Sequence, residues 1–286
     1  MNDIALIQGR LAEYHCSSAE EELNAIREIL QEMVLAGLSR TDFFVRAAFH
    51  GGTQLRIFEA VRRFSEDLDF ALVSPAPSFR LLPYLEKVSE ELAAIGVAME
   101  VRDKSKASAT VKKGFLKNDS LVGILDLRFV GGKGTPRKIS IKMEVDANPP
   151  AGATYRADNL LFPFPVSVRN FDRESAFSGK MHALLCRQYV KGRDWFDFVW
   201  YARVRAKLNH ALLSSAIDQQ GPWSGQGIAT SDAWVRERLL EVIAKMDWEE
   251  ARRDVMPFVY PSDRQSLGLW SGDFFSGLTE RLFIVQ

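Results

Sequence analysis

Two aspartates, Asp67 and Asp69, stand two positions apart at the head of the apolar residues 70–73. An apolar run of this kind predicts a β-strand, and residues two apart on a strand point to the same face. Two carboxylates on one face repel each other unless a cation joins them, and their hard oxygen atoms suit Mg²⁺. The spacing therefore predicts a divalent-metal site on this strand.

A glycine turn precedes that strand. Residues 43–50 are apolar enough to predict a buried strand, Gly51, Gly52 and Thr53 break it, and residues 54–61 predict a helix. Glycine lets the backbone come close to a ligand, and a helix N-terminus points free N–H groups outward. The turn is therefore predicted to seat phosphate groups beside the two aspartates.

A later strand carries further acidic residues. Residues 138–146 alternate strictly between apolar and polar types, so Lys142, Glu144 and Asp146 share one face. Taken alone, this pattern indicates a half-exposed amphipathic strand.

The C-terminal half adds a set of charged residues. Residues 174–190 predict a helix on which Lys180 and Arg187 lie seven positions apart, on one face. Asp194 is the predicted N-cap of the next helix, and Asp197 lies on its first turn. Surface cations, a cap and a favourable charge at a helix N-terminus would explain these residues without any chemistry.

Taken together, these segments resemble known enzymes. The order strand, Gly-Gly-Thr, helix and Asp-x-Asp strand resembles the nucleotide and metal motif of the nucleotidyltransferase superfamily. Gly-Gly-Thr-x-Leu followed by Arg-Phe-Ser-Glu-Asp-Leu-Asp-Phe (residues 63–70) resembles, more narrowly, the AbiEii/AbiGii toxin family. Lys-x-x-Ala-Leu-x-x-Arg at residues 180–187 and Arg-Asp-x-x-Asp-aromatic at residues 193–198 resemble that family's third and fourth motifs. His50 departs from the pattern, since the family usually carries lysine before the two glycines.

The resemblance spans roughly residues 20–280 and implies a fold and a set of site residues. The fold is α+β, with a nucleotidyltransferase-like mixed β-sheet core, flanking helices and a mainly helical C-terminal half. Residues 148–152 break the pattern, so one domain is expected over 1–150 and a helical domain that completes the active-site cleft over 151–286. The implied metal ligands are Asp67, Asp69 and Glu144, with Asp146 as the alternative to Glu144. The implied phosphate-binding residues are Gly51, Gly52, Thr53, Ser65, Lys180 and Arg187, while Asp194 and Asp197 orient the lysine or activate the acceptor hydroxyl.

The same resemblance implies an activity. A nucleotide passes from an NTP to an acceptor, with Mg²⁺ or Mn²⁺, and the acceptor in this family is often the 3′ end of tRNA. Members act as toxins of toxin–antitoxin or phage-defence (abortive infection) pairs, beside an antitoxin encoded next to them. Three alternatives remain open: a nucleotide-binding regulator without catalysis, nucleotidylation of a protein or small molecule, and a metal-dependent glycosyltransferase, which the short motif spacing disfavours.

Composition adds charge and location. Net charge is zero, but residues 102–142 hold eleven lysines and arginines against three aspartates, a local charge of +8. This segment predicts either an RNA-binding patch or strands with lysine-protected edges. No run of eighteen apolar residues and no signal peptide is found, and two cysteines and four histidines show no disulfide or zinc pattern, so a cytoplasmic protein with no membrane partner is expected.

The remaining pattern predicts the supporting elements. They are a Ser18-capped helix that ends at Gly37, a helix over 78–95, strands over 97–102, 109–117 and 121–130, a hairpin loop at 131–134, irregular structure over 153–172, and helices over 208–286 interrupted by a loop at 221–227.

Overall fold

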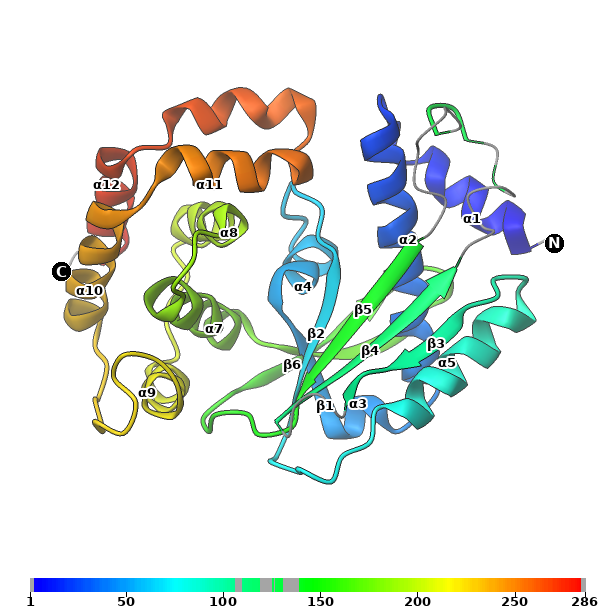
Figure 1. Ribbon diagram of the computed structural model, residues 1–286, viewed down its shortest axis with the longest axis horizontal. Helices are drawn as coiled ribbons and strands as arrows, with labels where there is room; N and C mark the ends of the chain where they lie inside the picture. Colours follow the sequence, from blue (N-terminus) through cyan, green and yellow to red (C-terminus); the bar gives the residue numbers. More distant parts are fainter. Residues whose placement is uncertain (1–2, 106–109, 119–124, 126, 131–138, 284–286) are drawn as a thin grey trace. The chain divides into compact units, whose positions relative to one another are not determined.

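The computed structural model describes residues 3–105, 110–118, 125, 127–130 and 139–283 (Figure 1). The chain divides into two compact units. Unit 1 comprises residues 1–60, 64–149 and 157–170, and unit 2 comprises residues 61–63, 150–156 and 171–286. Each unit is described by itself below.

A mixed seven-stranded sheet forms the framework of unit 1, in the order β3-β4-β5-β2-β1-β7-β6. The β2–β5 and β1–β7 pairs are parallel, whereas β1–β2, β3–β4 and β4–β5 are antiparallel. The first two residues of β6 and the last residue of β7 belong to unit 2. The strands are β1 Ala47–His50, β2 Asp67–Leu72, β3 Glu100–Asp103, β4 Val111–Asn118, β5 Ile139–Asp146, β6 Tyr155–Leu160 and β7 Val166–Phe171.

The helices of unit 1 bury the apolar side of this sheet. Ser18 caps α2 by accepting a hydrogen bond from the backbone N–H of Glu21. Apolar side chains from α2 and α5 join those from β2 and β5 in one buried core cluster. These helices are α1 Asp3–Ala12, α2 Ala19–Ser39, α3 Phe43–Arg46, α4 Gly51–Phe58 and α5 Leu82–Ala94.

Unit 2 is helical and has an aromatic core. Trp195, Trp248 and Phe275 pack together, with the rings of Trp248 and Phe275 stacked 4.3 Å apart. No described helix, in either unit, is both long and apolar enough to span a membrane. The helices of unit 2 are α7 Arg173–Cys186, α8 Gly192–Arg203, α9 His210–Gln219, α10 Asp232–Lys245, α11 Trp248–Val255 and α12 Gly272–Leu282, with 3-10 turns at Met256–Phe258 and Pro261–Leu269.

The predicted fold class is confirmed: the fold is α+β, with a mixed sheet and a helical C-terminal half. The predictions over residues 138–146 and 109–117 correspond to β5 and β4, and the helices after residue 208 are also present. The loop at 221–227 separates α9 from α10.

Several local predictions are wrong. The expected strand over 43–50 begins with the helical turn α3, because an apolar run alone does not separate a buried helix from a strand. Gly37 does not end α2, which continues to Ser39. A Cβ at Gly37 would lie 3.4 Å from Val88, so the glycine allows close packing on α5.

Two further errors concern loops. The segment 153–172 is not irregular, because it forms β6 and β7, and Pro163 and Pro165 lie in the connection between the two strands. Residues 125 and 127–130 form no strand. The backbone N–H groups of Arg128, Phe129 and Val130 donate instead to the Glu22 carboxylate. The predicted loop at 131–134 and the rest of 121–126 lie outside the described residues.

Candidate active site

A row of polar residues crosses the sheet of unit 1. The register pairs His50 with Asp69, Asp69 with Glu144, and Glu144 with Lys113. Directly paired residues on neighbouring strands share a face, so these four side chains lie on one side of the sheet. Asp67 lies on the same face, two residues before Asp69. The alternation in β2 therefore delivers both aspartates to the face opposite the buried Leu68.

The glycine turn lies against this row. Gly51 begins α4 directly after β1 and has a φ of +85°, a conformation that favours glycine. A Cβ at Gly51 would lie 2.8 Å from the Oδ2 atom of Asp69. Helix α4 has no side-chain cap from His50, so its first backbone N–H groups remain available to a ligand. The first residues of α4 therefore lie against the aspartate strand. The predicted turn at 51–53 and helix over 54–61 are one helix in the structure, which begins at Gly51 and ends at Phe58.

Two buried side chains fix the start of β2. The Thr53 hydroxyl donates to the carbonyl oxygen of Asp67, and Thr53 has no exposed surface. The Gln31 side chain donates to the carbonyl oxygens of Ser65 (3.2 Å) and Glu66 (2.8 Å). Thr53 therefore acts through its side chain as a brace for Asp67, which the sequence did not predict. Gln31 is a buried polar residue of α2, and the sequence predicted no role for it.

Two lysines neutralise the carboxylates of the row. Lys142 places its Nζ atom 3.3 Å from Asp67 Oδ2 and 3.1 Å from Glu144 Oε2. Lys113 Nζ lies 2.6 Å from Glu144 Oε1. Burial alone would raise the pKa of Glu144, but the two lysines outweigh it and lower that pKa. Burial alone would likewise lower the pKa of Lys142, and the carboxylates of Glu144 and Asp67 raise it.

The donor chemistry of this row suits a hard divalent cation only in part. Asp67 and Asp69 offer oxygen ligands from one face, but Lys142 engages both Asp67 and Glu144, and Lys113 engages Glu144 as well. Within the described ranges, no group of three or more histidine, cysteine or acidic side chains is arranged to hold a metal ion. Asp146 pairs with Ala71, two residues after Asp69 along β2. Its carboxylate accepts from the Asn148 N–H, and burial raises its pKa.

A second charged cluster lies in unit 2, around Lys180 on α7. Its Nζ atom lies 2.6 Å from Asp194 Oδ1 and 2.8 Å from Asp197 Oδ2, both carboxylates being carried by α8. Arg187 approaches the other oxygen of Asp194, with its Nε atom at 3.2 Å. The four residues predicted in this half of the chain are therefore brought together.

The local geometry of this cluster differs from the prediction. Helix α7 ends at Cys186, so Arg187 lies just beyond it rather than two turns along one helix face. Helix α8 begins at Gly192, so Asp194 lies in its first turn and is not the N-cap. A Cβ at Gly192 would lie 1.8 Å from the Ala251 carbonyl oxygen, so this glycine serves the close approach of α8 and α11.

Arg63 completes the cluster. Its Nε and Nη2 atoms donate to the two oxygens of Asp197 at 2.7 and 2.6 Å, and both side chains are buried. A buried, bidentate pair of this kind fixes both partners. Arg63 heads the motif that leads to Asp67, four residues later in the chain. The motif was recognisable from the sequence, but the role of this arginine was not, because only its burial and its contact with Asp197 mark it as a structural anchor.

Electrostatics keep the unit 2 cluster charged. Burial opposes ionisation of Asp194, but Lys180, Arg187 and Lys191 outweigh it and lower its pKa to about 2. Burial likewise opposes the charge on Lys180, and Asp194 and Asp197 reverse this and raise its pKa. Burial lowers the pKa of Lys191, a residue that the sequence analysis did not single out. Lys180 is therefore a fixed cation held by two carboxylates.

Comparison with known proteins gives these residues a context. Residues 33–267 match the nucleotidyl transferase AbiEii toxin family of type IV toxin–antitoxin systems. No curated protein matches the chain.

The chain is also similar to solved structures. The nucleotidyltransferase toxin MenT4 from Mycobacterium tuberculosis H37Rv is 18% identical, with a TM-score of 0.50, over 93% of this chain and 96% of that one. JHP933 from Helicobacter pylori is 16% identical, with a TM-score of 0.48, over 94% of this chain and 91% of that one. The family match covers most of the chain and includes the glycine turn, the aspartate strand and the Lys180 cluster, so the chain is a nucleotidyltransferase that belongs to the AbiEii toxin family.

Proposed function

We propose that this protein transfers a nucleotide from an NTP to the 3′ end of tRNA, with release of pyrophosphate, as the toxin of a toxin–antitoxin or phage-defence pair. The observation that carries this proposal is the polar row beside the glycine turn. The row presents Asp67 and Asp69 on one face of the sheet, against the uncapped N-terminus of α4. Carboxylates beside an anion seat suit a reaction at a phosphate group.

Asp67 and Asp69 would hold Mg²⁺ or Mn²⁺, with Glu144 as the third carboxylate once its lysines are displaced. When bound, the metal would neutralise the charge that develops on the transferring phosphoryl group. The backbone N–H groups of Gly52 and Thr53, together with Ser65, would bind the β- and γ-phosphates, which are the leaving group.

Lys180 and Arg187 would bind nucleotide phosphates through their positive charge. Lys180 suits this role because two buried carboxylates hold its ammonium group in one place. Asp194 and Asp197 would orient Lys180, and Asp194 would also help to activate the acceptor hydroxyl. In this reaction the acceptor oxygen forms a bond to the α-phosphorus, the bond from that phosphorus to pyrophosphate breaks, and the hydroxyl proton passes to a base.

The acceptor is the part of the proposal that needs its own experiment. Purified protein would be mixed with Mg²⁺ or Mn²⁺, each α-labelled NTP in turn, and total RNA, and the products separated on a denaturing gel. We expect the label to appear on a tRNA-sized band. A 3′→5′ exoribonuclease should then remove the label from that band.

Pyrophosphate release without labelled RNA would keep the transferase and overturn the tRNA acceptor in favour of a protein or small molecule. Nucleotide binding with neither product would favour a regulator without catalysis. An antitoxin encoded beside the toxin would be expected to suppress the labelled band when it is added to the same reaction.

A further inference from the structure

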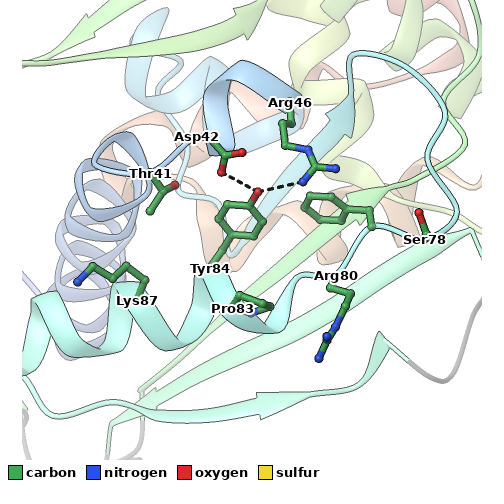
Figure 2. Close-up of a pocket in the computed structure, with 9 residues that line it drawn as sticks. Thr41, Asp42, Arg46, Ser78, Arg80, Pro83, Tyr84 and Lys87 are labelled. Atoms are coloured by element: carbon green, nitrogen blue, oxygen red, sulfur yellow. Dashed lines mark hydrogen bonds between the residues drawn. The ribbon is translucent and has the colours of Figure 1, made fainter.

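A cavity of about 510 Å³ opens in unit 1, away from the polar row (Figure 2). Arg46 lies at its rim, directly before β1, whereas the glycine turn follows the last residue of that strand. The four residues of β1 separate Arg46 from the glycine turn, over a length of about 13 Å. Strand β2 runs antiparallel to β1, so the segment after β2 that carries Ser78 and Arg80 returns to the same end as Arg46. The cavity and the glycine turn therefore lie at opposite ends of β1.

The cavity has a positive lining. Arg46, Arg80 and Lys87 contribute three cations and Asp42 one anion. Among the described residues, no carboxylate forms an ion pair with Arg46 or Arg80. Lys87 has only long contacts on an exposed helix face, at 3.4 Å to Glu90 and 3.9 Å to Glu91. Exposed pairs at such distances hold a charge weakly, so all three cations can receive an anion.

Tyr84 holds the arginine at the rim in place. Its hydroxyl donates to Asp42 Oδ1 at 2.8 Å and accepts from Arg46 Nη1 at 3.5 Å, as Figure 2 shows. The Arg46 guanidinium also lies 5.3 Å from the centre of the Phe79 ring. Burial and the hydrogen bond from Tyr84 to Asp42 raise the pKa of the tyrosine, so the hydroxyl remains a donor at neutral pH. Most of the five guanidinium N–H donors remain for a ligand.

The apolar part of the lining comes from an aromatic pair. The rings of Phe79 and Tyr84 stack 5.5 Å apart with an interplanar angle of 14°. A small-molecule site typically combines an apolar wall with a few polar anchors in about 300–1,000 Å³. An aromatic wall beside guanidinium groups suits a ligand that has both a phosphate and a flat or apolar body.

We propose that this cavity is a second nucleotide-binding site, which takes a nucleoside monophosphate unit with its phosphate on Arg46 and Arg80. The unit comes either from a bound RNA strand or from a free mononucleotide. The proposal does not depend on the reaction assigned to the polar row, because none of the residues involved belongs to that row.

Trypsin makes the site directly testable. Cleavage after Arg40, Arg46, Arg80 and Lys87 yields the peptides 41–46 and 81–87, which hold most of the cavity lining, and a separate peptide 47–56 that holds the glycine turn. The full-length protein would be photo-crosslinked to a single-stranded RNA containing 4-thiouridine and, separately, to 8-azido-AMP. The labelled peptides would then be identified by mass spectrometry.

The inference expects label within residues 41–46 or 81–87 from at least one probe. Label from the RNA alone assigns the cavity to the RNA strand, and label from 8-azido-AMP alone assigns it to a free nucleotide. Arg46→Gln and Arg80→Gln should each lower this labelling about tenfold, the cost of one lost charge-assisted contact. In these variants the merged tryptic peptides 41–56 and 64–87 would be measured, and fragmentation of each peptide would locate the labelled residue within it.

Lys207→Gln is the matched control, because Lys207 is an exposed cation of unit 2. It should leave the labelling unchanged. The proposal would be overturned if neither segment of the wild-type protein were labelled. It would also be overturned if both arginine variants were labelled as strongly as wild type, with unchanged circular dichroism. Labelling of peptide 47–56 reports the catalytic turn independently, so failure of one site is distinguishable from failure of the other.

Discussion

Neighbouring side chains hold the proposed reactive residues Asp67 and Lys180 in place. Asp67 depends on the Thr53 hydroxyl and the Gln31 amide, which fix the backbone around it. Lys180 depends on Asp194 and Asp197 in the same way. Substitutions at these positions should therefore separate loss of stability from loss of function.

Asp194 gives a prediction for pH. Its pKa in the folded protein is about 2, below the usual 3.8, so its ionised form stabilises the fold above about pH 4 and that stabilisation disappears as the pH falls towards 2. Asp194→Asn should lower the free energy of unfolding by about 2 kcal/mol at pH 7, and by much less at pH 2.5. Urea unfolding at both pH values measures this difference. An equal loss at pH 7 and pH 2.5 would contradict the assignment.

Gly51 gives a prediction about backbone geometry. Gly51→Ala forces a side chain into a positive-φ position and against Asp69, so it should cost about 1–2 kcal/mol of stability and abolish nucleotide transfer in the folded fraction. Gly9→Ala is the control, since a Cβ there meets nothing within 4 Å in α1 and should stabilise the helix by about 1 kcal/mol. Thermal unfolding and the labelled-NTP assay measure the two effects. Full activity of Gly51→Ala would show that the turn does not position Asp69.

At the scale of the elements, the close contact of α8 with α11 decides where the acidic residues of unit 2 lie. Gly192 is the first residue of α8 and leaves no room for a side chain against Ala251. Asp194 and Asp197 follow within the next two turns. Packing at the start of α8 therefore determines the positions of the carboxylates that bind Lys180.

Gly192→Ala should lower the free energy of unfolding by about 2–3 kcal/mol, because its Cβ would overlap a backbone carbonyl that cannot move aside freely. Gly179→Ala, on the open face of α7, should be neutral or slightly stabilising. Chemical denaturation of both variants compares them directly. Equal stability of the two would contradict the tight contact between α8 and α11.

The elements also show how far the sequence could be interpreted. Alternation of apolar and polar residues predicted β5, and the Asp-x-Asp spacing predicted the exposed face of β2, because a strand has a period of two. The start of α3 and the strands β6 and β7 were missed, since an apolar run and isolated prolines do not specify which backbone groups find partners. The interactions of Arg63, Gln31, Lys113 and Lys142 depend on contacts between residues far apart in the sequence, which no local pattern contains.

At the scale of the whole molecule, the net charge is zero, but the basic residues are concentrated in the segment 102–142. Lys113 and Lys142 belong to the basic segment 102–142, yet both lie against Glu144. They neutralise carboxylates of the polar row, while the Lys113 side chain remains 40% exposed. The +8 of that segment therefore overstates the charge that RNA would meet there.

In the proposed reaction, Asp67 and Asp69 are the metal ligands and Lys180 is a phosphate-binding residue. Arg63 is anchored in unit 2 by Asp197, and it stands four residues before Asp67 in the chain. Of these groups, Asp67 should be the most important for nucleotide transfer.

The most direct test compares wild type, Asp67→Asn and Asp273→Asn in one assay of label transfer from α-labelled NTPs to tRNA. Asparagine keeps the size of the side chain and removes its charge, and Asp273 is an exposed aspartate of α12 that serves as the control. Wild type and Asp273→Asn should label tRNA at similar rates. Asp67→Asn, with an unchanged unfolding midpoint, should lose at least about a thousandfold in rate, as expected when a charge that stabilises the transition state is removed. Transfer by folded Asp67→Asn at the wild-type rate would contradict the account.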